Sequence, residues 1–108
     1  MSNPTVEYRN LGASAQLADQ SVNPYYLPDR KLRVSVARIG DSLFAFDDLC
    51  PHDGAQLSAG MLTGRTLMCP CDGSRFDVST GAIEAGPSTK LLPIYEVREL
   101  DGTISVRV

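Results

Sequence analysis

Hydrophobic and polar residues alternate along two stretches of the chain, and both stretches predict antiparallel β-hairpins. The first hairpin is expected over residues 33–46, with its turn at Gly40-Asp41. The second is expected over residues 95–108, where Asp101-Gly102 readily adopts the positive φ angles of a two-residue hairpin turn. Because no segment shows a sustained helical period, the pattern predicts an all-β antiparallel sandwich or small barrel.

The segments outside these hairpins follow a weaker pattern. Residues 1–32 are predicted to form an N-terminal edge strand and a loop, since the segment from Pro24 to Pro28 cannot be regular helix. Residues 50–90 hold most of the glycines and all three cysteines, with short strand-like pieces at 66–69 and 75–78. A stretch so rich in turn-forming residues is expected to project from the sheet as ordered loops.

We therefore expect a single domain over residues 1–108. Its base sheet is predicted from residues 33–49 and 92–108, and a loop-built subdomain is predicted from residues 50–90. Four apolar side chains at strand-like spacing are expected in the core: Phe44, Phe46, Leu67 and Phe76.

Composition narrows the classes of partner. The chain has 108 residues, a formal charge of −3 and only two lysines, so it lacks the basic field on which nucleic-acid binding relies. It has no apolar run long enough for a membrane span, and Met1–Glu7 shows no secretion signal. We expect a cytoplasmic protein, a monomer or weak oligomer, without a nucleic-acid or membrane partner.

The middle segment nearly repeats itself. Residues 50–55 read Cys-Pro-His-Asp-Gly-Ala, and residues 69–74 read Cys-Pro-Cys-Asp-Gly-Ser. In each copy a proline restricts the loop behind the cysteine, and a later glycine permits the tight reversal that can aim backbone N–H groups at a sulfur. Without a secretion signal, the three cysteines are better interpreted as ligands or reactive thiols than as a disulfide framework.

These loops offer a set of soft metal ligands. Two thiolates, one imidazole and a further thiolate or carboxylate suit zinc or an iron–sulfur centre rather than calcium or magnesium. The residues concerned are Cys50, His52, Cys69 and either Cys71 or Asp72. A mononuclear zinc or iron site built from the same residues is an open alternative.

The spacing of these residues resembles the sequence pattern of the Rieske [2Fe–2S] proteins. The resemblance rests on Cys50-x-His52, a 16-residue spacer, Cys69, and the following Gly73-Ser74-x-Phe76-Asp77, and it extends roughly over residues 33–108. It implies the Rieske fold and a [2Fe–2S] cluster. It also implies a small soluble ferredoxin that passes single electrons from a reductase to a terminal oxygenase, without catalytic residues of its own.

The chain departs from the family pattern at one ligand. Asp72 stands where the family has its second histidine, so the resemblance implies Cys50 and Cys69 on one iron and His52 with Asp72 on the other. A carboxylate adds negative charge, which predicts a lower reduction potential than two histidines would give. Aligning the two copies instead matches Cys71 to His52, and Cys71 is therefore kept as an alternative fourth ligand.

Three further questions are left open by the sequence. Loss of one ligand is also compatible with a cluster-less accessory subunit, similar to the small subunits of nitrite reductases. Met61 and Leu62 are candidates to screen the cluster from water. An acidic set could be an ordinary solvated face or a negative rim that steers a basic redox partner, and it comprises Asp41, Asp47, Asp48, Asp53, Asp72 and Asp77.

Overall fold

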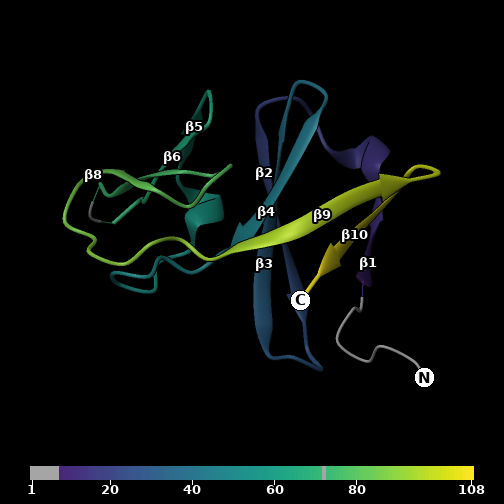
Figure 1. The fold of residues 1–108 in the computed structure, drawn as a ribbon, viewed down its shortest axis with the longest axis horizontal. Helices are drawn as coiled ribbons and strands as arrows, with labels where there is room; N and C mark the ends of the chain where they lie inside the picture. The colour runs from purple at the N-terminus through teal and green to yellow at the C-terminus, as the bar shows by residue number, and fades with distance from the viewer. Residues whose placement is uncertain (1–7, 72) are drawn as a thin grey trace.

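The computed structural model describes residues 8–71 and 73–108, so the predictions made for Met1–Glu7 and for Asp72 lie outside the described residues. A large antiparallel sheet curls into a half-barrel with the strand order β1-β10-β9-β4-β3-β2, and a small sheet has the order β5-β6-β7-β8. Figure 1 shows the small sheet and its loops to one side of the large sheet. The all-β fold class predicted from the sequence is confirmed.

The strands of the large sheet are β1 (Tyr8–Ala13), β2 (Ser21–Leu27), β3 (Leu32–Ile39), β4 (Ser42–Asp47), β9 (Ile94–Leu100) and β10 (Thr103–Arg107). Those of the small sheet are β5 (Met61–Thr63), β6 (Thr66–Met68), β7 (Arg75–Asp77) and β8 (Ile83–Ala85). Two single turns of 3-10 helix complete the elements, η1 (Ser14–Gln16) and η2 (Leu57–Ala59). None of the helical turns that the described residues form has the length or apolar character of a transmembrane helix.

Both predicted hairpins are present. β3 pairs with β4 and β9 pairs with β10, each in antiparallel register. At the second turn Asp101 has φ 51° and Gly102 has φ 75°, which are the positive angles expected of a two-residue hairpin turn.

The N-terminal segment differs from its prediction. The predicted edge strand is present as β1, but a second strand stands where a loop was predicted, because residues 21–27, including Pro24, pair with β3 as β2. Proline is tolerated there because β2 is the last strand of the sheet, where an N–H can be missing without breaking a ladder. The short strands β5 and β8 were also not predicted, since three-residue strands show too little alternation to detect.

The middle of the large sheet is buried on both faces. Val34 and Val36 pack into one core with Ile104 and Val106. Ser35 lies between them on β3, points to the opposite face and is fully buried as well. Ala37 on that face belongs to a second core, to which the small sheet also contributes.

This second core contains the predicted core aromatics and two of the cysteines. Phe46, Leu67 and Phe76 are fully buried in it, as predicted, and Phe44 packs partly buried against it. Cys50 and Cys69 belong to the same cluster. The cysteines therefore lie where the loops meet the apolar interior.

Candidate metal centre

The two repeated segments fold into loops with the same backbone hydrogen bonds. In the first loop the N–H of Cys50 donates to the carbonyl of Ala55, and the N–H of Gly54 donates to the carbonyl of Cys50, both at 2.8 Å. The corresponding pairs of the second loop are Cys69 to Ser74 at 2.7 Å and Gly73 to Cys69 at 3.2 Å. The glycines have φ angles of 77° and 78°, a conformation that side chains disfavour. The sequence repeat is therefore also a structural repeat.

The loops bring two sulfurs together. Ligand atoms of Cys50, Asp53 and Cys69 all lie within 4.8 Å of one another. The two cysteines are 3% and 1% exposed, whereas Cys71 is exposed, and no disulfide bond joins any two of these three described residues. The structure thus places the sulfurs of Cys50 and Cys69 close together.

Asp53 is a neighbour of this pair that the sequence analysis did not place there. The thiol of Cys69 donates to its carboxylate, with sulfur–oxygen distances of 3.8 and 3.9 Å. The same carboxylate accepts the N–H of Ala55 at 2.9 Å, which holds it over its own loop. A signal was available, since Asp53 occupies in the first copy the place that Asp72 occupies in the second.

The other described residues that were predicted as ligands, His52 and Cys71, are not part of this close group. His52 is exposed on the first loop and is not among the described groups whose ligand atoms gather within 4.8 Å. Cys71 is exposed on the second loop, at the position equivalent to that of His52. The structure thus brings together two of the four residues predicted as ligands, and Asp72 lies outside the residues it describes.

A third segment braces the second loop. The N–H of Ser88 donates to the hydroxyl of the buried Ser74 at 3.1 Å. Gly86, with φ 92°, lies so close that a Cβ atom there would be 2.5 Å from the Cα of Ser74. The backbone at residues 86–88 therefore packs directly on the loop that carries Cys69.

The members of the acidic set that the structure describes do not all lie on one exposed face. Asp48 is fully buried, Asp53 lies beside the sulfur of Cys69, and Asp47 is half-buried. Burial raises the pKa of Asp47, while the N–H of Leu49, which donates to its carboxylate at 3.0 Å, lowers it. The described acidic residues therefore have different surroundings.

Met61 and Leu62 are placed on opposite faces of β5. Leu62 packs against the core that contains both cysteines. Met61 is 63% exposed and instead lines an open pocket of about 360 Å³ on the small sheet, together with Thr63, Thr66, Met68 and Arg75.

The turn at residues 77–79, beyond the second loop, should make the stability of the protein depend on pH. The hydroxyl and the N–H of Ser79 donate to the carboxylate of Asp77 at 2.5 and 2.8 Å. Both bonds lower the pKa of Asp77, and the bond from the hydroxyl has the larger effect. Since the folded pKa lies below the unfolded one, this contribution to stability is present above about pH 4 and is lost as the pH falls through the folded pKa. Ser79→Ala should cost about 0.5–1 kcal/mol at pH 7 and less at pH 3.

Urea unfolding of the metal-free protein at both pH values measures this effect. Ser42→Ala, at an exposed serine that begins β4, is the matched control. An equal loss for Ser79→Ala at pH 7 and pH 3 would show that the charge of Asp77 is not involved.

Comparison with known proteins shows to which family the chain is similar. The family described as "Rieske [2Fe-2S] domain" matches residues 8–96. The anthranilate 1,2-dioxygenase ferredoxin subunit of Burkholderia cepacia is 40% identical over 75 residues, which are 69% of each chain.

Solved structures agree with this assignment. The complex of reduced oxygenase and oxidized ferredoxin in carbazole 1,9a-dioxygenase contains a chain that is 29% identical, with a TM-score of 0.86 over 93% of this chain and 92% of that one. A putative NADH-dependent nitrite reductase small subunit from Mycobacterium tuberculosis has a TM-score of 0.81 over 94% of each chain, and its 23% identity shows a shared fold alone. The chain belongs to the Rieske [2Fe–2S] family, and within it to the ferredoxins, which carry electrons rather than catalyse a reaction.

Proposed function

We propose that this chain carries a [2Fe–2S] cluster with atypical ligation and relays single electrons. Cys50 and Cys69 would hold one iron, and His52 and Asp72 would hold the other. The observation that carries the proposal is the convergence of two buried cysteine sulfurs on loops with matching backbone hydrogen bonds. Residues 1–108 would act as one unit in this role.

The donor set and its burial fit such a group. The cysteines lie in the apolar core, while His52 on the same loop is exposed, so an iron held by His52 would lie on the solvent side. When bound, the cluster supplies a site that takes up and releases one electron. The chain's own task is to hold the thiolates in fixed loops, exclude water on the cysteine side and leave the histidine side accessible to a partner.

The partners proposed are a reductase as donor and the terminal oxygenase of an aromatic-ring dioxygenase as acceptor. Support comes from the relatives, one a ferredoxin subunit of anthranilate 1,2-dioxygenase and one found in a complex with its oxygenase. The three cysteines without a disulfide bond suit a reducing compartment, and we propose that the protein works in the cytoplasm.

Metal analysis tests the proposal directly. The purified protein should contain about two irons and two acid-labile sulfides per chain, and the reduced form should give an electron paramagnetic resonance spectrum of a [2Fe–2S]⁺ centre. One zinc per chain would instead establish the mononuclear site. Protein that takes up no metal after reconstitution with iron and sulfide would establish the cluster-less accessory subunit.

Asp72→His tests the fourth ligand. Removing one negative charge about 5 Å from the electron, at an effective dielectric constant near 20, changes the energy by about 3 kcal/mol, or on the order of 100 mV. The midpoint potential should therefore rise, and it should become more dependent on pH because a second imidazole can ionise. Protein-film voltammetry from pH 6 to pH 10 gives both quantities, and an unchanged potential would remove Asp72 from the ligand set.

Cys71→Ser tests the alternative ligand. Because Cys71 is exposed and lies apart from the Cys50 and Cys69 pair, the variant should keep its iron and sulfide within about 10% of the wild type. Iron and sulfide content is measured on both proteins prepared in parallel. A loss of most of the iron would identify Cys71, rather than Asp72, as the fourth ligand.

A further inference from the structure

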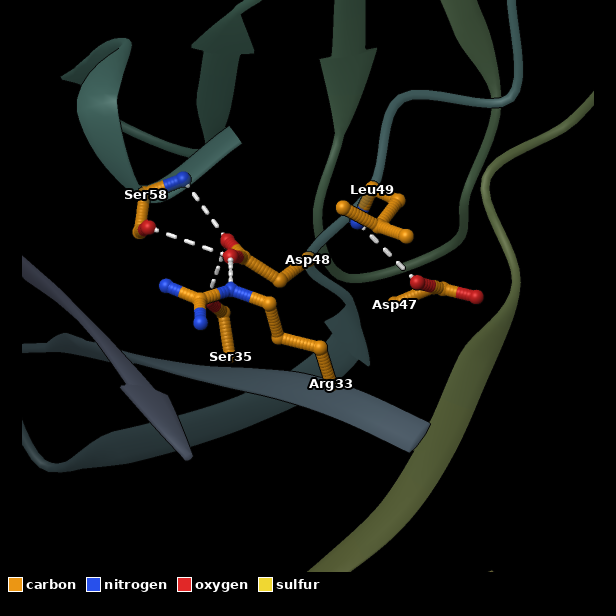
Figure 2. A network of polar contacts seen from close by, with 6 residues as sticks. All are labelled: Arg33, Ser35, Asp47, Asp48, Leu49 and Ser58. Carbon is orange, nitrogen blue, oxygen red and sulfur yellow. Dashed lines mark hydrogen bonds and ion pairs between the residues drawn. The ribbon is translucent and has the colours of Figure 1, made fainter. Parts of the chain in front are cut away.

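We propose that Asp48 is a positioning residue that holds the first metal-binding loop against the large sheet and so fixes the place of Cys50. Its side chain is fully buried, and both carboxylate oxygens are used. One oxygen accepts the hydroxyl of Ser35 at 2.7 Å and the N–H of Ser58 at 2.8 Å. The other accepts the Nε–H of Arg33 at 2.5 Å and the hydroxyl of Ser58 at 3.2 Å (Figure 2).

This network, the Asp48 clamp, consists of Arg33, Ser35, Asp48 and Ser58. Arg33 and Ser35 belong to β3, and Ser58 lies in η2 beyond the loop. The clamp therefore ties the beginning of the first loop both to the large sheet and to the segment that follows the loop. Figure 2 shows the carboxylate between these two supports.

Backbone hydrogen bonds connect the clamp to Cys50. The N–H of Leu57 donates to the carbonyl of Asp48 at 2.6 Å, and Leu49 forms an isolated bridge with Gln56. The next rung is the bond from the N–H of Cys50 to Ala55. These hydrogen bonds join residues 48–50 to residues 55–57. Fixing Asp48 therefore also restricts the backbone of Cys50, two residues further along the chain.

All four hydrogen bonds of the clamp come from donors, so the position suits a side chain whose two oxygens both accept. A buried carboxylate is costly unless it is paired and hydrogen-bonded. Here three hydrogen bonds from Ser35 and Ser58 and a fourth from the guanidinium of Arg33 meet both needs. Arg33 remains 31% exposed, so its own charge keeps contact with water. Asparagine has the same size but places an N–H₂ group against donors, so Asp48→Asn should open the clamp without removing volume.

The second loop has separate support from residues 86–88, which do not belong to the clamp. The relative position of the two sulfurs therefore depends on two independent braces. Opening the Asp48 clamp should displace Cys50 and leave Cys69 where it is.

The consequence for a bound cluster rests on the proposed function, but the clamp itself is testable in metal-free protein. We would measure amide hydrogen exchange of metal-free wild type, Asp48→Asn, Ser58→Ala and Val106→Ala. The last variant removes buried volume from the other core and serves as a control for lost stability. The exchange rates of Cys50, Gly54 and Leu57 are compared with those of Ile104 and Val106.

Asp48→Asn should speed exchange of the three loop amides about tenfold relative to the amides of β10, with a smaller effect in Ser58→Ala. Unchanged loop exchange would overturn the proposal. So would a uniform increase like that of Val106→Ala, because it would show a contribution to stability alone. If Asp48→Asn does not fold, Ser58→Ala decides by the same comparison.

In reconstituted protein, a chelator should bleach the visible absorption of Asp48→Asn about tenfold faster than that of wild type and of Val106→Ala at the same temperature. Equal bleaching rates would overturn the link from the clamp to the metal centre. A wild type that forms no cluster would refute the proposed function, while the exchange experiment would still decide whether the clamp holds the loop.

Discussion

Gly60→Ala should destabilise the protein by about 2–3 kcal/mol, lower its melting temperature by about 10 °C and impair metal loading. Gly60 follows η2 and precedes β5, with φ −85° and ψ −163°, angles open to any residue. A Cβ atom there would overlap the carbonyl oxygen of Met68 and lie 3.1 Å from the carbonyl oxygen of Leu57. Because Met68 immediately precedes Cys69, the methyl group would push the segment that follows the first loop away from the start of the second.

Gly102→Ala is the matched control. Gly102 has φ 75° in the hairpin between β9 and β10, and nothing lies within 4 Å of the position a Cβ would take. The free energy of unfolding of Gly102→Ala should therefore fall by only about 1 kcal/mol, because of backbone strain, and the variant should keep its metal content. Thermal unfolding and metal analysis of both variants separate the two causes. Full metal loading of Gly60→Ala would show that the two loops tolerate separation at this point.

The parts of the fold that follow from local pattern were predictable. Alternation marked both long hairpins, and Asp101-Gly102 marked the turn of the second. The strand at Pro24 was not predicted, because proline signals a loop unless the strand lies at a sheet edge, and edge position is a property of the whole sheet. Likewise, Ser35 is buried beside Asp48, a contact between residues 13 positions apart that alternation along one strand does not reveal.

Some features of the candidate site could also be predicted from the sequence, and others could not. The repeat of Cys-Pro-x-Asp-Gly predicted two similar loops, and their hydrogen bonds and glycine angles match. Asp48 stood in the sequence only as a member of an acidic set, yet it closes the base of the loop. Its partners lie 10 to 15 residues away on other segments, so no local pattern reveals it. Asp53 contacts Cys69, and the equivalence of Asp53 and Asp72 in the repeat was the signal for it.

Cys69→Ser should reduce iron and sulfide to below about a tenth of the wild-type content, because a serine hydroxyl is a harder and more weakly acidic ligand than a thiol. The protein should still fold, since the change replaces one atom in a residue whose N–H and carbonyl continue to hold the loop. Circular dichroism checks the fold, and iron and sulfide analysis after reconstitution measures the loss. Cys50→Ser should behave in the same way, because its sulfur lies in the same buried group.

Asp53→Asn distinguishes a cluster from a single metal ion at this place. Its carboxylate lies within 4.8 Å of both sulfurs, so a mononuclear ion bound there would use Asp53 as a third ligand and would be lost with it. In the proposed ligation Asp53 is only a neighbouring charge, and the variant should keep two irons per chain while its midpoint potential rises, because one negative charge near Cys69 is gone. Loss of metal from Asp53→Asn as complete as from Cys69→Ser would refute the cluster ligands proposed here, since both the third ligand and the number of metal ions would then be wrong.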